Sequence, residues 1–387
     1  MSDAIPLDTA RLEAWAQANV PGFSGPIAAT KFATGQSNPT YLIETPSGRY
    51  VLRRKPPGKL LKSAHAVERE FRVLRALEGV GFPAPRALAL CEDESVVGST
   101  FYLMSHVEGR IFWDPALPDL TPPERAAIYD SMNAALARLH SVDVVANGLG
   151  DYGKPGDYFA RQLQRWTEQY RASETEVNAD MDRLIAWLGA NARPDDGRVA
   201  LVHGDWRIDN MIFDKASARL AAVLDWELST LGHPFADLAY QCMQWRMPNV
   251  VTSRTQIGDS RGLGGVDRAA LGIPTESEYV DAYCRRAGIP ACRAGRFFLR
   301  SASFATPPSR RASTSARLTG TPPIPSAPAR RDRLCRCWRA WRSNSSSRAR
   351  DNPAESRRSF HAFTNGQPPL SSGRQASSGL IVATTLK

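Results

Sequence analysis

The chain has 387 residues and a formal net charge of +10, which taken alone would suggest an anionic partner. The charge is uneven, because residues 291–387 contain 17 Arg, 1 Lys and 3 acidic residues, whereas residues 1–290 carry a net charge of −5. No apolar run approaches the roughly 18 residues of a membrane span, and the N-terminus lacks the apolar core of a signal peptide. We therefore expect a cytoplasmic protein with no membrane partner.

The first hundred residues have the pattern of a small β-rich unit. A short helix is expected over 7–19, with Asp8 as its N-cap. Three strands separated by polar turns are expected between 28 and 53, and two more at 87–90 and 100–104. Residues 63–77 have apolar side chains at three- and four-residue spacing, which predicts an amphipathic helix that begins at Ser63.

A loop of small residues, GQSNP at 35–39, joins two of these strands. The backbone N–H groups of such a loop can face an anion, so the loop could lie over the phosphates of a nucleotide. An ordinary hairpin turn is the alternative. The residues expected to contact the nucleotide here are Gly35, Ser37 and Asn38.

One cation in the third strand is a second candidate for phosphate binding. Val51 and Arg53 share a face by the two-residue period of a strand, and a guanidinium pairs well with phosphate. A surface arginine is the alternative. In the next helix Glu68 and Glu70 are candidates for its ion-pair partner, and we favour Glu70 because it precedes the apolar Phe71.

The basic residues that follow Arg53 form a Pro-containing loop. We expect this loop to be solvated, although it could also contact a phosphorylated or CoA-like substrate. Its members are Arg54, Lys55, Lys59 and Lys62.

After the fifth strand the chain changes from mainly β to mainly helical. The open connection MSHVEG at 104–109 is where the adenine of a nucleotide would bind backbone groups in a two-lobed kinase, at Met104 and His106. Thr121 and Glu124 form a capping box at the start of a helix that ends near residue 140. Further helices are expected at 158–170, 180–188 and 276–286.

The stretch 199–225 contains the residues that indicate chemistry. Its apolar runs at 199–202, 211–213 and 220–224 are expected to be short buried strands. The spacing His203-x-Asp205-x4-Asn210 matches the protein-kinase catalytic loop, in which the Asp accepts a hydroxyl proton and the Asn holds a metal. Asp225 follows the last strand and supplies a second oxygen ligand of the kind Mg²⁺ prefers. The alternative is that both aspartates cap turns and that His203 is a satisfied buried histidine.

With these motifs in place, the chain resembles the aminoglycoside phosphotransferase (kinase-like) family, in the branch related to the kinase-like domain of acyl-CoA dehydrogenase family proteins. The segments that carry the resemblance lie within about residues 30–290 and include GQSNPTYLI, FYLMSHVEGRIFW, LVHGDWRIDNMIFD and VLDWELSTLGHPFADLAY.

The resemblance implies an α+β, two-lobed protein-kinase-like fold with a β-rich nucleotide-binding N-lobe at 1–106 and a mainly helical catalytic C-lobe at 107–290. It implies ATP and Mg²⁺, and transfer of phosphate to the hydroxyl of a small molecule. Asp205 would be the catalytic base, with Asn210 and Asp225 as metal ligands. Arg53, paired with Glu70, takes the phosphate-binding position at which many relatives have Lys.

Residues 291–387 depart from this resemblance. They are rich in Arg, Ser, Pro and Ala without sustained periodicity, so we expect a disordered tail. Our hypothesis is a frameshift near codon 291, since GC-rich codons read out of frame encode mostly these residues, and the native C-terminal helices would then be missing. The alternative is an arginine-rich tail that binds nucleic acid.

The residues and the resemblance together leave three functions open. The first is an ATP-dependent kinase whose acceptor is a hydroxyacyl-CoA-like metabolite. The second is an aminoglycoside kinase. The third is a non-catalytic binding protein, either a pseudokinase or an incomplete product.

Overall fold

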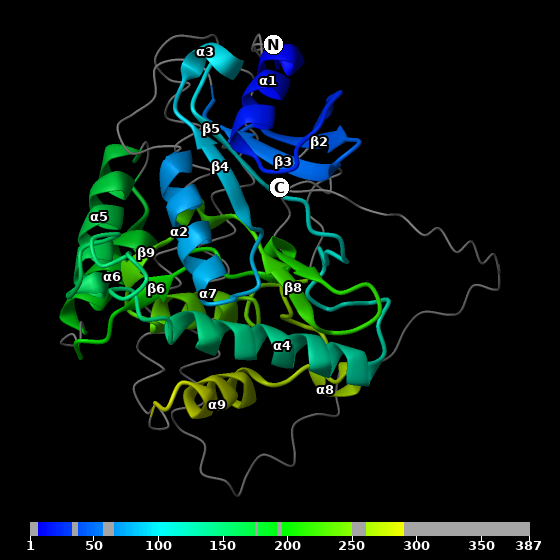
Figure 1. The fold of residues 1–387 in the computed structure, drawn as a ribbon. Coiled ribbons are helices and arrows are strands. Elements are labelled where there is room, and N and C mark those ends of the chain that lie inside the picture. Colours follow the sequence, from blue (N-terminus) through cyan, green and yellow to red (C-terminus); the bar gives the residue numbers. More distant parts are fainter. Residues whose placement is uncertain are drawn as a thin grey trace, which may run out of the picture.

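The computed structural model describes residues 7–32, 38–56, 66–174, 177–191, 196–249 and 261–289, which form two lobes (Figure 1). The smaller lobe is built on a five-stranded antiparallel sheet with the strand order β1-β2-β3-β5-β4. The β-rich N-lobe expected from the sequence is therefore confirmed. Its strands are β1 Ala28–Lys31, β2 Thr40–Thr45, β3 Gly48–Arg54, β4 Ala87–Cys91 and β5 Phe101–Ser105.

Helices cover both faces of this sheet. Helix α1 (Thr9–Asn19) and the short α3 (Glu94–Val97) lie on one face, and α2 (Val67–Gly79) lies on the other (Figure 1). Successive strand residues point to opposite faces, so neighbours such as Val51 and Leu52 are both buried, one against each helical layer.

The helix boundaries in this lobe test two predictions. Asp8 caps α1 as expected, since its Oδ1 accepts a hydrogen bond from the Arg11 backbone N–H at 3.0 Å. Helix α2 begins at Val67 with Ala66 as N-cap, so the expected start at Ser63 is wrong. Ser63 itself lies outside the described residues.

The larger lobe is organised around the long helix α4 (Pro122–His140). One face of this helix is apolar and buried, because residues three and four apart lie on one side of a helix; it consists of Ile128, Met132, Ala135, Leu136 and Leu139. Helix α9 lies alongside α4 (Figure 1), where Asn133 Nδ2 of α4 donates to the Tyr279 carbonyl of α9 at 2.8 Å. The other helices of the lobe are α5 Tyr158–Ala172, α6 Ala179–Ala190, α7 Phe235–Met243, α8 Arg268–Leu271 and α9 Glu276–Arg286.

Two small antiparallel sheets lie at the top of this lobe, next to the N-lobe. Strand β6 (Ala200–Val202) pairs with β9 (Thr230–Gly232), and β7 (Met211–Phe213) pairs with β8 (Leu220–Val223). The sequence predicted three of these four strands and missed β9. The loops that follow β6 and β8 contain the short 3-10 helices Ile208–Asn210 and Trp226–Leu228, and they carry the candidate catalytic residues.

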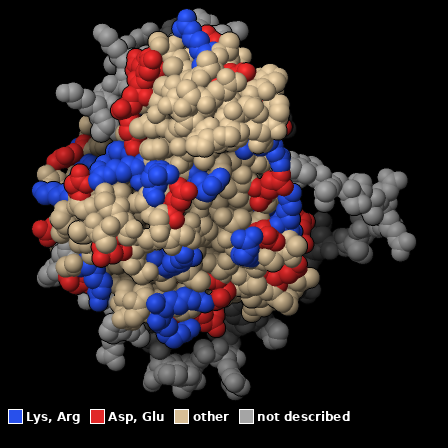
Figure 2. Space-filling model, in the orientation of Figure 1, with Lys and Arg blue, Asp and Glu red and all other residues tan. Residues whose placement is uncertain are grey.

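On the face drawn in Figure 2, the described part of the surface has acidic and basic side chains interspersed, so charge of one sign is not concentrated there. Within the described ranges, no helix is both long and apolar enough to cross a bilayer. The tail 291–387 lies outside the described residues, and with it the predictions of disorder, a frameshift and nucleic-acid binding.

Candidate active site

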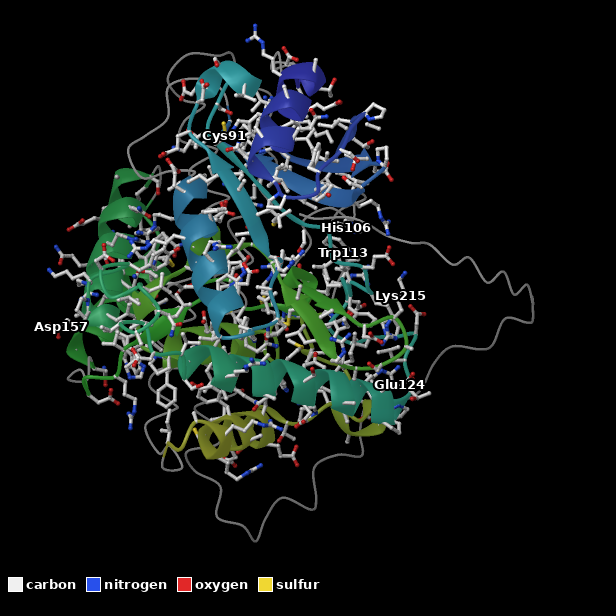
Figure 3. The ribbon with its side chains drawn as sticks, in the orientation of Figure 1. Cys91, His106, Trp113, Glu124, Asp157 and Lys215 are labelled. Carbon is white, nitrogen blue, oxygen red and sulfur yellow. The ribbon has the colours of Figure 1, made fainter. Side chains whose placement is uncertain are left out.

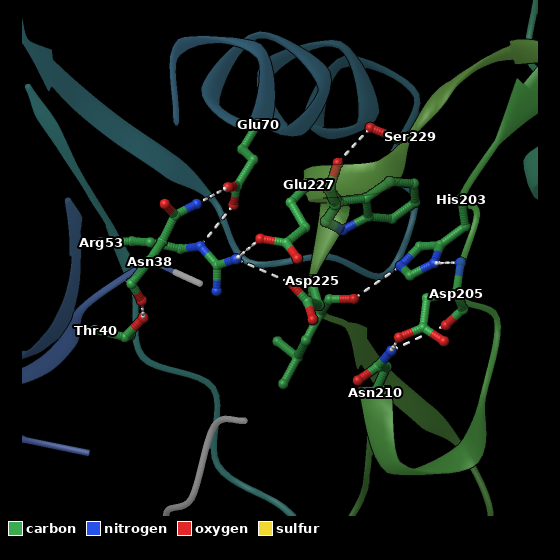
Figure 4. Close-up of polar contacts among 12 residues, drawn as sticks. Asn38, Thr40, Arg53, Glu70, His203, Asp205, Asn210, Asp225, Glu227 and Ser229 are labelled. Carbon is green, nitrogen blue, oxygen red and sulfur yellow. Dashed lines mark hydrogen bonds and ion pairs between the residues drawn. The ribbon is translucent and has the colours of Figure 1, made fainter. Parts of the chain in front are cut away.

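Arg53 and Glu70 meet beneath the sheet of the N-lobe. Arg53 Nε lies 2.8 Å from Glu70 Oε2, and both side chains are almost completely buried (Figure 4). Two neutral groups hold the glutamate in place, since Asn38 Nδ2 donates to its Oε1 at 2.9 Å and the Tyr102 hydroxyl donates to its Oε2 at 3.0 Å. Strands β3 and β5, helix α2 and Asn38, which lies just before β2, thus fix the direction in which the Arg53 guanidinium points.

The same guanidinium reaches across to the C-lobe. Arg53 Nη2 donates to Asp225 Oδ1 at 2.8 Å and to Glu227 Oε2 at 3.2 Å. Burial alone would lower the pKa of Arg53, but Glu70 and Asp225 raise it well above its ordinary value, so the group stays charged. Among the described residues, Nη1 has no hydrogen-bond partner, and in Figure 4 it points away from the carboxylates.

The residues of the predicted catalytic loop lie beside this cluster. Asn210 Nδ2 donates to Asp205 Oδ2 at 3.0 Å, which leaves the amide oxygen of Asn210 available for another partner. The Leu224 N–H donates to the Asn210 carbonyl at 2.8 Å, and His203 Nε2 is hydrogen-bonded to the Leu224 carbonyl at 2.8 Å. These bonds place Asp225, which follows Leu224, next to the loop that holds Asp205 and Asn210.

Asp205 is kept ionised by its surroundings. Burial by itself would raise the pKa of this carboxyl, but the Arg207 guanidinium and hydrogen bonds from Tyr240 and Asn210 hold it below its ordinary value. Arg207 Nε lies 3.5 Å from Asp205 Oδ1, and the same guanidinium pairs with Asp209. A hydrogen-bond acceptor that is charged at neutral pH is what a general base requires.

Asp237 holds the backbone of the predicted catalytic loop in place. It is fully buried in α7, and its carboxylate accepts the backbone N–H of His203 at 2.7 Å and that of Gly204 at 2.8 Å. Gly204 has φ +87°, and a Cβ there would come within 2.8 Å of the Leu228 carbonyl oxygen, so the position requires glycine. His140 Nε2 also lies 3.2 Å from this carboxylate.

Replacing Asp237 by asparagine is expected to lower the free energy of unfolding by about 1.5–3 kcal/mol, because hydrogen bonds to a charged acceptor are lost from a buried site. Urea unfolding of the variant and the parent protein measures this change. An unfolding free energy equal to that of the parent would show that Asp237 does not brace the loop.

The segment expected to bind adenine forms the connection between the lobes. Met104 is buried in the inner strand β5, and His106 lies just past the end of this strand, on the side of the molecule where Figure 3 also shows Trp113 and Lys215. His106 Nε2 is buried and has no hydrogen-bond partner in the described part of the chain. Burial, assisted by Arg49, lowers the pKa of His106, so its ring is neutral at neutral pH.

An apolar patch lies next to this connection. Val107 and Ile111 of the connecting segment pack against Ile212 and Leu224 of the β7–β8 region. The patch therefore joins the predicted adenine position to the residue that precedes Asp225.

Some of the predicted residues are not described by the structure, and for others the structure corrects the prediction. Gly35 and Ser37 lie outside the described residues. Arg54 was expected in a solvated loop, which is wrong: it is the buried last residue of β3 and donates to the Val97 carbonyl at 2.6 Å. Lys55 pairs with Glu68, the glutamate that was not chosen as the partner of Arg53.

Sequence reasoning overlooked four residues of this site. Glu227 could have been found from the sequence, because it is an acidic residue only two positions after the candidate metal ligand Asp225. Tyr102 could not have been found from the sequence, because its contact with Glu70 depends on its position opposite Arg53 in the sheet register. The other two, which surround Asp205, are Arg207 and Tyr240.

The comparisons with known proteins agree with this geometry. A model of the phosphotransferase enzyme family matches residues 28–272. The mouse acyl-CoA dehydrogenase family member 10 is 49% identical over 281 residues, which are 73% of this chain and 26% of the relative. The rat acyl-CoA dehydrogenase family member 11 is 43% identical over 286 residues, which are 73% of this chain and 36% of the relative. The chain thus spans about a third or less of these curated relatives.

Solved structures give the same result for the fold. A protein from Ralstonia eutropha JMP134, described as a candidate aminoglycoside phosphotransferase, is 43% identical with a TM-score of 0.74, and the match covers 88% of this chain and 99% of that one. Choline kinase from Cryptosporidium parvum is 12% identical with a TM-score of 0.56, over 88% of this chain and 97% of that one. The chain belongs to the phosphotransferase enzyme family and has the two-lobed fold of a small-molecule kinase.

Proposed function

We propose that this domain transfers the γ-phosphate of ATP to the hydroxyl group of a small molecule. Residues 1–106 would bind the nucleotide, and residues 107–290 would bind the acceptor and carry out the chemistry. The single observation that best supports the proposal is the contact of Arg53 with both Glu70 and Asp225, which links the N-lobe cation to a candidate metal ligand beside the catalytic loop.

The site suits a nucleotide in two respects. The unpartnered, buried Nε2 of His106 beside the apolar patch of Val107 and Ile212 gives a hydrogen-bonding and an apolar group for adenine. Arg53 Nη1, which has no partner among the described residues, gives a fixed cation for phosphate oxygens. We propose that Asn38 and Met104 border this nucleotide site with Gly35 and Ser37.

The oxygen donors also suit Mg²⁺. This ion usually takes one or two protein carboxylates and completes its shell with phosphate oxygens and water. Asn210 offers an amide oxygen and Asp225 a partly exposed carboxylate, whereas no group of three or more His, Cys, Asp or Glu in the described ranges could form an all-protein metal cage. Mg²⁺ held by Asn210 and Asp225 would supply positive charge next to the phosphoryl oxygens.

The chain's own residues have separate tasks in the proposed reaction. Asp205 accepts a hydrogen bond from the acceptor hydroxyl and takes its proton as that oxygen bonds to the γ-phosphorus and the bond to ADP breaks. Asn210 holds the Asp205 carboxylate in position through the hydrogen bond to Oδ2. Arg53 binds the nucleotide phosphates, oriented by Glu70.

For the acceptor we propose a hydroxyacyl-CoA-like metabolite. Support comes from the names of the relatives, which are acyl-CoA dehydrogenase family members. Arg54 gives no support, because its guanidinium is buried inside the N-lobe. An aminoglycoside is the second candidate, in line with the description of the Ralstonia relative.

The proposal is tested by measuring ADP formation by the full chain with ATP, Mg²⁺ and a panel of hydroxyacyl-CoAs and aminoglycosides. We expect ADP formation that depends on one class of acceptor. Thermal unfolding with and without ATP and Mg²⁺ is measured alongside. If the protein neither forms ADP nor is stabilised by the nucleotide, the kinase proposal is wrong and the non-catalytic alternative stands.

A further inference from the structure

The carboxylate of Glu227 shares one nitrogen of Arg53 with Asp225, the proposed metal ligand. We infer that Glu227 is a positioning residue that holds the Arg53 guanidinium in its phosphate-binding orientation when Asp225 turns to the metal. This inference rests on the proposed function, because it concerns how the same nucleotide site works.

The geometry of the guanidinium makes this division of labour feasible. Its Nε faces Glu70 at 2.8 Å, and its Nη2, which carries two hydrogens, faces Asp225 Oδ1 at 2.8 Å and Glu227 Oε2 at 3.2 Å (Figure 4). Both hydrogens of Nη2 therefore have an acceptor. If Asp225 binds a metal instead, Glu70 still contacts Nε and Glu227 still contacts Nη2. These two contacts keep the plane of the Arg53 guanidinium from rotating.

The charges in this cluster also favour the arrangement. Three carboxylates surround one guanidinium, which leaves an excess of negative charge at the junction of the lobes before any ligand binds. The Asp225 and Glu227 side chains are each 21% exposed, whereas Glu70 is 2% exposed. Asp225 is therefore more accessible to a bound cation than Glu70.

The local backbone explains why these two carboxylates lie together. Asp225 has a left-handed conformation with φ +65°, and the chain then makes the 3-10 turn Trp226–Leu228. Trp226 anchors the turn, since its ring is buried and its Nε1 donates to the Val223 carbonyl at 3.0 Å. The buried tryptophan leaves the residues on either side of it to face Arg53.

The experiment measures metal binding rather than turnover. Mn²⁺ is titrated into the full chain in the presence of ADP, and free Mn²⁺ is followed by electron paramagnetic resonance. Replacing Glu227 by glutamine is expected to raise the apparent Kd for Mn²⁺ about tenfold, because Nη2 of Arg53 loses its second charged acceptor, pairs more strongly with Asp225, and has to be displaced from Asp225 by the metal.

A double-mutant cycle separates this role from direct metal binding by Glu227. In a protein that already carries Arg53→Lys, the ammonium is a point charge without the fixed fork that contacts Glu70, Asp225 and Glu227 together, so Glu227→Gln is expected to change the Kd less than about twofold. A tenfold change in both backgrounds would make Glu227 a metal ligand and overturn the inference. Glu227→Asp, which retains the charge but shortens the side chain, should also weaken Mn²⁺ binding, and wild-type affinity in that variant would equally overturn it.

The parent protein provides the control for the proposed function. If the parent binds Mn²⁺ with ADP and Glu227→Gln does so with equal affinity, only the inference about Glu227 fails. If the parent binds neither Mn²⁺ nor ADP, the nucleotide site itself is absent and both proposals fail. Thermal unfolding of each variant shows whether a loss of binding is a loss of folding.

Discussion

A variant in which Asp205 is replaced by asparagine is expected to turn over about 10²–10⁴ times more slowly than the parent, because an amide cannot take the proton of the acceptor hydroxyl. The amide oxygen of an asparagine can still accept the hydrogen bond that Asn210 Nδ2 donates, so the loop should keep its geometry. The loss should therefore appear in kcat while the affinity for ADP stays close to that of the parent. Steady-state kinetics with the identified acceptor, together with ADP binding, measures both.

Asp214→Asn is a matched control for this change. Asp214 lies on the exposed turn between β7 and β8, where its carboxylate accepts the Ala216 backbone N–H at 3.0 Å, and it is outside the proposed site. The kcat of the Asp214→Asn variant should equal that of the parent. An unchanged kcat in the Asp205→Asn variant would show that Asp205 is not the base.

Replacing Arg53 by methionine should have the largest effect on stability. The change leaves Glu70 buried without its cation, and breaking a buried ion pair by removing one partner costs about 3–5 kcal/mol of unfolding free energy. The cation proposed to bind the nucleotide phosphates is lost as well, so stabilisation by ATP should disappear. Urea unfolding and thermal unfolding with ATP measure these two losses.

Two further variants show whether the stability effect comes from the unpaired charge. Adding Glu70→Gln to Arg53→Met removes the buried unpaired carboxylate and should restore part of the lost unfolding free energy. Arg72→Met removes an arginine from an exposed pair with Asp151 and should cost much less, because solvent screens that pair. Equal losses for the two arginines would show that burial of Arg53 is unimportant.

Much of the fold could be predicted because it depends on local patterns. The apolar face of α4 and the capping box at Thr121 follow from the spacing of residues three and four apart. The strands of the N-lobe follow from alternation and turn residues. Elements without such a pattern were missed, among them the four-residue α3 and α8 and the three-residue β9, because so few residues show no periodicity.

The candidate site also has a part that local sequence predicts and a part that depends on contacts between distant segments. The sequence by itself determined that Asp205, Asn210 and Asp225 follow short buried strands, since this information lies within one stretch of chain. Only the tertiary structure decided that Arg53 contacts three carboxylates, that Asp237 braces the catalytic loop and that Arg54 is buried. The physical reason is that these contacts join residues from separate elements, such as Arg53 and Glu227, which are 174 positions apart, and they depend on strand register and on how the lobes pack.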